Sequence, residues 1–461
     1  MTSLIAVLYI IAFALFIYGL MGLTGPRTAV RGNWIAAVGM GIAVVATLLT
    51  PGMSDWVLIA LGVGIGTVVG IPSARKVKMT AMPQMVALFN GVGGGAVALI
   101  AWVEFRTTEG YAHEPVYVAI ASLFAALVGS VSFWGSLIAF GKLQEMITGR
   151  PVTLGKVQQP VNLLLLVGSV ACGVAISFGA TSELLIIGLL VASAVLGVMV
   201  VLPIGGADMP VVISLLNALT GLSAAAMGLA LDNTALIVAG MIVGASGSIL
   251  TNLMAKAMNR SIPAIVAGGF GGAAVAAGGG SGEQRPVRST SAADTAIQMA
   301  YASRVVVVPG YGMAVAQAQH AVREMADLLE GKGITVSYAI HPVAGRMPGH
   351  MNVLLAEADV PYERLKEMDE INSEFAQTDV ALVIGANDVT NPAAETDPSS
   401  PIYGMPILKV NASRSVIVLK RSMSSGFAGI DNDLFYDPKT SMLFGDAKSS
   451  VGDIVEELKA L

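Results

Sequence analysis

A series of long apolar runs is the strongest constraint on how this chain can fold. About nine such runs lie near residues 3–23, 33–50, 55–71, 84–103, 115–141, 160–179, 183–204, 211–231 and 234–255, and each is close to the length that crosses a bilayer as a helix. A helix is expected because it satisfies its own backbone hydrogen bonds in hydrocarbon. Only 12% of the 461 residues are charged, against roughly 25% in soluble proteins. The sequence therefore predicts a polytopic α-helical membrane domain over residues 1–262, surrounded by membrane lipid.

Basic residues are concentrated in alternate loops between these runs. They are Arg27, Arg31, Arg75, Lys76, Lys78, Lys142, Arg150, Lys156, Lys256 and Arg260. The intervening loops carry almost no basic charge. By the positive-inside rule, the N-terminus is then outside and the long C-terminal region is cytoplasmic. An odd number of spans requires the same arrangement, and we expect a bacterial inner membrane as the location.

Polar residues inside the apolar runs are informative because an unpaired polar group is costly in hydrocarbon. Asn90, Ser132, Ser214 and Asn217 lie within runs, and Asp208 stands at the mouth of the eighth run. Each asparagine either joins two helices or lines a hydrated path, and Asp208 either caps a helix or takes part in proton movement. The sequence contains neither a row of charges typical of a voltage sensor nor a potassium-filter motif. A proton path is therefore favoured over a route for a bulky solute.

Simple counts exclude other kinds of site. The single cysteine, Cys172, allows neither a disulfide nor a cysteine metal site within one chain. The four histidines show no metal-ligand spacing, so no metal is expected. A net charge of -5 gives no reason to expect a nucleic-acid partner.

The C-terminal region has a different pattern. Glycine-rich stretches at 268–272 and 278–282 predict a flexible linker over residues 263–289. From residue 290 to 461, apolar strands at 304–308, 334–340, 380–384, 406–410 and 415–419 alternate with helical stretches such as 313–330 and 446–460. Such alternation predicts an α/β Rossmann-like domain with a parallel, doubly wound sheet, whose site lies at the carboxyl ends of the strands.

Four loops at these strand ends are candidates for binding a dinucleotide. The first follows four valines and forms a strand–turn–helix signature suited to a pyrophosphate; it comprises Gly310, Tyr311, Gly312, Met313, Ala314 and Val315. The second offers Val343, Ala344, Gly345 and Arg346. The third offers Gly385, Ala386, Asn387 and Asp388, and the fourth Lys420, Arg421 and Ser422.

The charges in these loops favour NADP over NAD. An NAD site usually has an acid after its second strand to bind the ribose 2′-hydroxyl, and this chain has Arg346 there. Lys420 and Arg421 suit a ribose 2′-phosphate, because a guanidinium fork and an ammonium neutralise a dianion. A solvated Lys-Arg pair at a strand end is the simpler alternative.

Seven motifs together resemble the beta subunit of proton-translocating nicotinamide nucleotide transhydrogenase, over essentially the whole chain. They are Pro-Gly-Tyr-Gly-Met-Ala-Val-Ala-Gln-Ala-Gln (309–319), Ile-His-Pro-Val-Ala-Gly-Arg-Met-Pro-Gly-His-Met-Asn-Val-Leu-Leu-Ala-Glu-Ala (340–358), Met-Asp-Glu-Ile-Asn (368–372), Val-Ile-Gly-Ala-Asn-Asp (383–388), Lys-Arg-Ser-Met (420–423), Gly-Asp-Ala-Lys (445–448) and Gly-Gly-Ala-Asp-Met-Pro-Val-Val (205–212).

The resemblance implies that the C-terminal domain binds NADP(H) in a reversed orientation, while NAD(H) binds a partner alpha subunit that adds further membrane helices. Hydride passes directly between the two nicotinamides as protons cross the membrane, in a dimer of alpha–beta units. The resemblance also adds Gly426, Phe427, Gly445, Asp446 and Ala447 to the cofactor site. It gives Asp388 a catalytic part, responsive to redox state and protonation.

Two positions depart from the family pattern. Asn90 stands where many relatives have a histidine, and because an asparagine does not titrate, the partner subunit is a candidate source of the titrating group of the proton path. Phe427 replaces a frequent tyrosine. The alternative function is a cation transporter gated by a regulatory nucleotide-binding domain. Hydride transfer is favoured because it needs no nucleophile or base, only two rings held together with water excluded.

Overall fold

The computed structural model describes residues 2–148, 151–205, 208–259, 261–266, 285–347, 349–400, 402–426 and 428–461. These residues form two compact units, Met1–Ile204 with Val212–Thr251 and Gly205–Val211 with Asn252–Leu461. The first is a bundle of apolar helices and the second contains a parallel sheet. The predicted fold class is confirmed. Most of the predicted linker, residues 267–284, lies outside the described residues.

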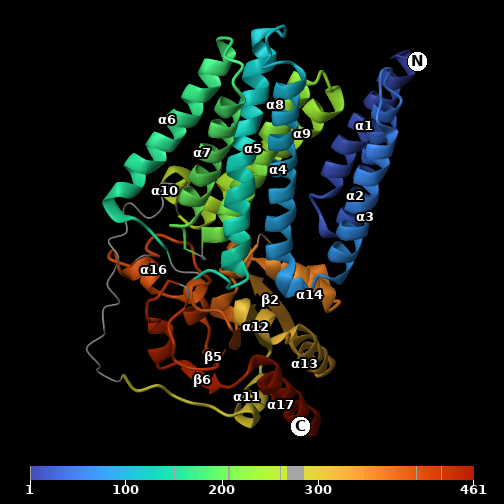
Figure 1. The fold of residues 1–461 in the computed structure, drawn as a ribbon. Helices are drawn as coiled ribbons and strands as arrows, with labels where there is room; N and C mark the ends of the chain where they lie inside the picture. The colour runs from blue at the N-terminus through green and yellow to red at the C-terminus, as the bar shows by residue number, and fades with distance from the viewer. Residues whose placement is uncertain are drawn as a thin grey trace. The chain divides into compact units, whose positions relative to one another are not determined.

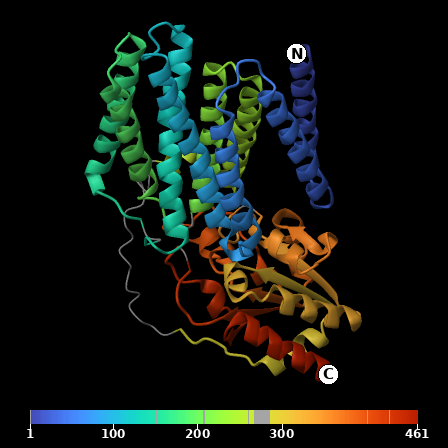
Figure 2. The ribbon, with the colours of Figure 1, turned by 45° about the vertical axis from the view of Figure 1, so that its right-hand side comes forward.

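Nine helices in the described part of the chain are long and apolar enough to cross a membrane. They are α1 (Thr2–Gly22), α2 (Pro26–Leu48), α3 (Trp56–Lys76), α4 (Met82–Thr107), α5 (Val116–Leu143), α6 (Gln158–Ser177), α7 (Glu183–Val201), α8 (Met209–Ala230) and α9 (Thr234–Ala257). Their long axes follow a common direction within the bundle (Figures 1 and 2). Each of the nine predicted runs is thus confirmed as a helix of membrane-spanning length. The second begins earlier than predicted because Pro26 starts α2, a position where proline costs no helical hydrogen bond.

Small residues allow these helices to pack closely, as expected in lipid. A Cβ atom on Gly94 of α4 would lie 2.9 Å from the carbonyl oxygen of Gly129 in α5. On Gly221 of α8, it would lie 2.6 Å from the backbone nitrogen of Gly244 in α9. These glycines therefore serve helix packing.

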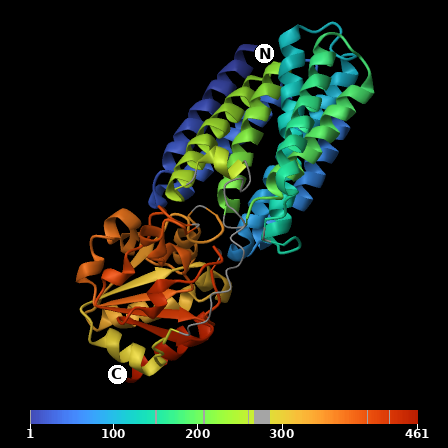
Figure 3. The same ribbon diagram turned by 90° about the vertical axis from the view of Figure 1, so that its left-hand side faces the viewer.

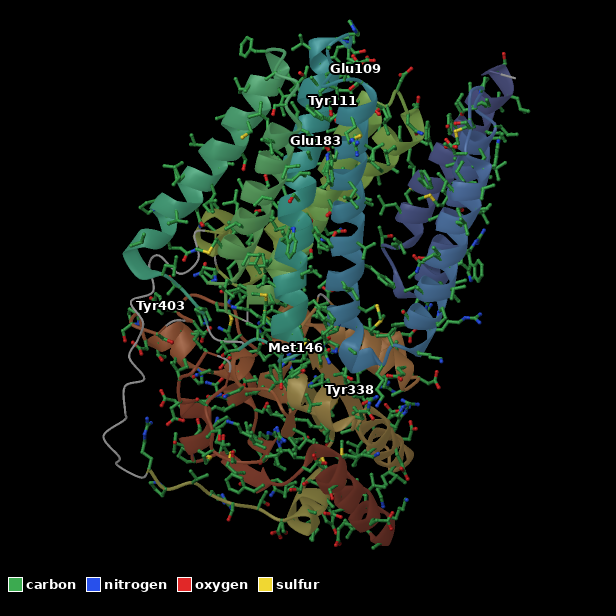
Figure 4. The ribbon with its side chains drawn as sticks, viewed as in Figure 1. Glu109, Tyr111, Met146, Glu183, Tyr338 and Tyr403 are labelled. Carbon is green, nitrogen blue, oxygen red and sulfur yellow. The ribbon has the colours of Figure 1, made fainter. Side chains whose placement is uncertain are left out.

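Tyr111 holds the loop between α4 and α5 in place. Its backbone is left-handed (φ 63°), and its buried hydroxyl bonds Ser122 Oγ at 2.6 Å and the Ala101 carbonyl at 3.2 Å. At the same end of the bundle, Glu183 accepts a 3.1 Å hydrogen bond from Trp102 Nε1 (Figure 4). These contacts join the ends of three helices without forming a site.

The second unit contains a six-stranded parallel sheet in the order β3-β2-β1-β4-β5-β6 (Figure 3). The strands are β1 (Arg304–Pro309), β2 (Thr335–Ile340), β3 (Leu365–Glu367), β4 (Val380–Ile384), β5 (Ser415–Lys420) and β6 (Thr440–Phe444). Valines 305–308 are fully buried at the centre of the core. The order reverses between β1 and β4, which is where doubly wound folds bind their ligands.

One predicted strand is wrong and two real strands were not predicted. Residues 406–410 are a loop in which the apolar residues Ile407, Leu408 and Val410 are buried. Its amides bond individually, Leu408 N–H to the Val389 carbonyl and Lys409 N–H to Asn372 Oδ1. Pro406 cannot donate to a ladder, so the apolar run packs without joining the sheet. The strands β3 and β6 are short and lack a strong local sequence pattern. They are strands because they pair with β2 and β5.

The predicted helix 313–330 is two helices, α12 (Tyr311–Ala316) and α13 (Gln319–Gly331), because Gln317 is left-handed (φ 52°). The predicted helix 446–460 is confirmed as α17 (Ala447–Ala460). The remaining α-helices of the described residues are α10 (Ile262–Val266), α11 (Ala292–Ala300), α14 (His350–Glu357), α15 (Met368–Ile371) and α16 (Ala393–Thr396). Helices α11 and α13 pack against α17.

Candidate functional site

The loops after β1 and β4 interlock through their backbones at the point where the strand order reverses. The Gly310 N–H donates to the Ile384 carbonyl at 2.9 Å, and the Gly312 N–H to the Gly385 carbonyl at 3.0 Å. A Cβ on Gly310 would lie 2.4 Å from the backbone nitrogen of Ala386. Gly385 has a positive φ of 63°. All three glycines are required by this contact itself.

This geometry explains the glycine-rich turn by packing between two loops, whereas the sequence suggested close approach to a pyrophosphate. The N–H groups of Gly310 and Gly312 are used within the protein, so they do not point at a pyrophosphate. Met313 and Ala314 are buried, whereas Val315 is 49% exposed. A role of this turn in holding a cofactor stays a prediction, and its immediate function is to fix the β1 and β4 loops to each other.

The loop after β2 joins the site through Tyr311. The guanidinium carbon of Arg346 lies 4.4 Å from the centre of the Tyr311 ring, a cation–π contact. Arg346 N–H donates to His350 Nδ1 at 3.0 Å. Gly345 has a φ of 110°, and a Cβ there would lie 2.5 Å from His350 Nδ1. Arg346 is thus placed at the strand ends by both the tyrosine and the histidine.

Two buried histidines in this region are neutral. Burial, with a smaller effect of Arg346, lowers the pKa of His350 to about 4. Burial also lowers the pKa of His341 to about 4, against a hydrogen bond with the Pro406 carbonyl that raises it. In both rings Nδ1 accepts a backbone N–H, that of Arg346 or Val343, so the proton is assigned to Nε2. The sequence spacing of these histidines did not indicate that they are neutral and accept backbone hydrogen bonds, because both properties depend on burial.

The loop after β4 supports a second loop, residues 421–432, which we call the crossing loop. Asp388 Oδ2 accepts the Ala428 N–H at 2.9 Å. Asn432 Nδ2 donates to the carbonyl and to Oδ1 of Asn387, at 3.1 and 2.9 Å. A Cβ on Gly426 would lie 2.4 Å from Asn387 Nδ2. Gly426 is therefore a glycine because the crossing loop passes directly over these two side chains.

Two buried asparagines anchor this loop, a role that the sequence analysis did not assign to either of them. Asn432 is fully buried, and Asn391, also fully buried, donates from Nδ2 to the Asp431 carbonyl at 2.9 Å. Within the described residues, buried Asn387 Nδ2 has no hydrogen-bond partner. The only sequence signal for these anchors is an unusual density of Asn and Asp around 387–391 and 431–433. Phe427 lies outside the described residues.

The two cations after β5 have different surroundings. Lys420 Nζ donates to the Ser424 carbonyl and lies 4.7 Å from the centre of the Phe435 ring. Burial lowers the pKa of Lys420, although Asp388 and Asp431 oppose the shift. Arg421 is exposed and, in the part of the chain that the structure describes, its side chain makes no ion pair or hydrogen bond. Ser422 Oγ bonds Ser424 Oγ at 2.8 Å. Arg421 is thus the cation available to an anion.

The residues after β6 have structural contacts of their own. Gly445 N–H donates to the Lys420 carbonyl at 3.1 Å. Asp446 caps α17 by accepting the N–H groups of Lys448 and Ser449, and Ala447 is buried. A cofactor role for these three residues stays a prediction.

In the helical bundle, Asn90 is the centre of a buried polar cluster. Its Nδ2 donates to Ser136 Oγ at 2.9 Å and to Ser132 Oγ at 3.4 Å. Ser132 Oγ also bonds Thr220 Oγ1 at 2.6 Å. The cluster therefore links α4, α5 and α8. Asn90 Oδ1 is buried and has no hydrogen-bond partner among the described residues.

The other predicted polar residues are not brought into this cluster. Ser214 accepts from Thr251 Oγ1 at 3.0 Å, which joins α8 to α9. Asn217 is exposed on α8 and makes no hydrogen bond within the described ranges. Asp208 lies before α8, next to residues 206–207, which are outside the described part. A shared hydrated path through Asn90, Asn217 and Asp208 stays a prediction.

These features define a class of protein: a polytopic helical membrane protein that carries a Rossmann-like domain, with candidate nucleotide-binding loops at the switch point of its sheet.

Comparison with known proteins identifies the family within this class. The family model for the NAD(P) transhydrogenase beta subunit matches residues 5–457. Two relatives named NAD(P) transhydrogenase subunit beta, both from Rhodospirillum rubrum and one from a named strain, are each 51% identical to this chain over 465 residues, covering 99% of this chain and 99% of the relative. The chain belongs to the NAD(P) transhydrogenase beta subunit family. It is a component of an enzyme complex of a family that binds NADP(H), and a beta subunit has an alpha subunit as its partner.

Proposed function

We propose that this chain binds NADP(H) at the carboxyl ends of β1, β4 and β5, and that the partner alpha subunit binds NAD(H). When bound, NADP(H) supplies or accepts the hydride. The observation that carries this proposal is the meeting of the loops after β1 and β4 at the reversal of the strand order, which is where Rossmann folds hold dinucleotides.

The residues at these strand ends fit NADP(H). Exposed Arg421 offers a guanidinium fork for a 2′-phosphate, with the ammonium of Lys420 beside it in sequence. The Nδ2 atom of Asn387 is a buried donor that lacks a partner within the described residues. Arg346 takes the place where an acid would select NAD.

This chain's own residues prepare the site rather than perform acid–base chemistry. The crossing loop lies over Asn387 and Asp388 and is bonded to both of them, and a covered site of this kind suits a hydride transfer, which requires that water be kept out. Asp388 joins the loop to the β4 end, so a change in its charge alters how the loop is held. We assign Asp388 to this coupling between nucleotide state and the rest of the protein.

We further propose that protons cross the helical bundle near the cluster of Asn90, Ser132 and Thr220, with Ser214, Asn217 and Asp208 on the same route. Asn217 is exposed on α8, and an amide facing lipid is costly. Membrane helices of the alpha subunit that cover Asn217 would remove this cost and supply the titrating group that Asn90 does not. The dimer of alpha–beta units, the outside N-terminus and the bacterial inner membrane complete the proposal.

The two functions left open by the sequence predict different products. Membranes that contain this chain and its alpha subunit are given NADH labelled with deuterium at the transferable position of the nicotinamide, together with NADP⁺. Direct hydride transfer predicts NADPH that retains the deuterium. A cation transporter with a regulatory nucleotide domain predicts no NADPH, and label lost to water would contradict direct transfer. Family membership favours the first outcome.

A further inference from the structure

The last residues of the predicted linker are attached to the edge of the sheet. Ser289 pairs in parallel with Met442 of β6. The Thr290 N–H donates to the Met442 carbonyl at 2.9 Å, and the Met442 N–H donates to the Arg288 carbonyl at 2.7 Å. Residues 288–290 therefore form a short added strand beside β6, within the described segment that begins at residue 285.

Arg285, at the start of this segment, reaches the residues that follow the crossing loop. Its Nη1 atom lies 2.8 Å from Asp433 Oδ1. The guanidinium carbon also lies 4.5 Å from the centre of the Tyr436 ring. The Tyr436 hydroxyl in turn donates to Asp431 Oδ2 at 2.8 Å. Two kinds of contact from one guanidinium thus converge on a short stretch of chain.

The same stretch is anchored to the candidate nucleotide site. The Asp431 carbonyl accepts from Asn391, and the side chain of Asn432 donates to Asn387. Asn387 and Asp388 lie directly under Gly426 of the crossing loop. A continuous set of contacts therefore runs from Arg285 to the loop that covers the β4 end.

We propose that Arg285 is a positioning residue that couples residues 285–290 to the crossing loop, so that its contacts help to set the rate of NADP(H) release. This inference rests on the proposed function, because it requires NADP(H) at the β1, β4 and β5 ends. The Arg285–Asp433 pair is about half exposed on both sides, and such pairs are individually weak. The coupling therefore comes from the Arg285–Asp433 ion pair and the Arg285–Tyr436 cation–π contact acting together. Because each contact is weak, we expect the substitution to have only a moderate effect on the rate of NADP(H) release.

The test uses the complete alpha–beta complex in membranes and compares Arg285→Gln with Arg288→Gln. Arg288 is an exposed arginine three residues away whose side chain makes no hydrogen bond, ion pair or cation–π contact among the described residues. Release of bound NADPH is measured with and without a proton gradient. The exchange of hydride between NADH and an NAD⁺ analogue, through NADP(H) that stays bound, is measured in the same membranes.

For Arg285→Gln we expect release to change by about three- to tenfold and to depend less on the proton gradient, while the exchange rate stays within about twofold of the unsubstituted complex. Arg285→Lys, which keeps the charge, should restore part of the effect. Asp433→Asn should reproduce it, and the double variant should add little to either single one. Arg288→Gln should match the unsubstituted complex.

Equal release from the Arg285→Gln and Arg288→Gln complexes would overturn the inference, as would additive effects of the Arg285 and Asp433 substitutions. A parallel fall in exchange, release and protein amount would indicate a merely structural role and would also overturn it. If the unsubstituted complex showed no NADP(H)-dependent exchange, the proposed function itself would fail, which separates the two results.

Discussion

At the residue scale, Gly312 shows how a motif position can serve the protein before it serves a ligand. A Cβ there would lie 2.7 Å from the Gly385 Cα atom, so Gly312→Val forces apart two loops that pack backbone to backbone. We expect a loss of about 1–3 kcal/mol in stability together with loss of NADP(H) binding. The sequence alone suggests a folded mutant that simply fails to bind. Thermal unfolding of the complex should separate these outcomes, with Gly452→Ala, which meets open space, as the control; unchanged unfolding would contradict the packing argument.

The charge of Arg421 is predicted to select NADP(H) over NAD(H). Removing a charge-assisted contact to a phosphate costs about 1.5–3 kcal/mol, so Arg421→Ala should weaken NADP(H) binding by about tenfold or more while leaving the weak NAD(H) binding unchanged. Lys332→Ala is a suitable control because exposed Lys332 precedes β2, at the amino end of that strand, whereas Arg421 follows the carboxyl end of β5. Competition between the two nucleotides measures the effect, and an unaltered preference for NADP would refute the assignment.

The two buried histidines give the second unit a predictable response to acid. Each has a folded-state pKa of about 4, below the usual value of about 6.5. The unfolded state therefore binds protons first, and stability present above pH 6.5 is lost as the pH falls toward 4. Nuclear magnetic resonance of histidine-labelled complex should show a ring that stays neutral to about pH 4 and whose signals disappear in His350→Gln. Titration of that ring near 6.5 would contradict its burial.

At the scale of elements, the patterns that were long or repeated could be predicted and those set by pairing could not. The nine apolar helices and the strands containing valines 305–308 follow from length and composition, because burial on all sides selects unbroken apolar runs. Strands β3 and β6 depend on neighbours distant in sequence, and Pro406 keeps a similar apolar run out of the sheet. The candidate site loops could be predicted because they follow the carboxyl ends of predicted strands. The role of Asn391 and Asn432 in anchoring the crossing loop is recognisable only from their burial and hydrogen bonds.

The helix α8 carries the prediction for the membrane unit. Leu216 and Thr220 on this helix contact Ser132, whereas Asn217 is exposed. Asn217→Leu should slow proton-coupled transhydrogenation several-fold and spare hydride exchange between bound nucleotides, because only the hydrated route is interrupted. Asn162→Leu on α6 removes an amide elsewhere in the bundle and serves as the control. If both activities of the Asn217 variant fell together with the amount of folded protein, Asn217 would serve only the folding or assembly of the protein.

At the scale of the whole molecule, one chain combines a bundle of apolar helices with a nucleotide-type sheet. The presence of both parts in one chain is explained if the chemistry at the sheet is linked to the movement of protons across the membrane. The family provides that link, and the polar cluster around Asn90 together with the contacts of the crossing loop identifies the residues that are candidates for it.

The most direct test of this link is internal pH in sealed vesicles that contain the alpha–beta complex with the second unit facing outward. When NADPH and NAD⁺ are added outside, the account predicts that proton movement across the membrane begins with hydride transfer, stops when the nucleotides are exhausted, and reverses direction with NADH and NADP⁺. Hydride transfer at full rate with no change in internal pH would contradict it.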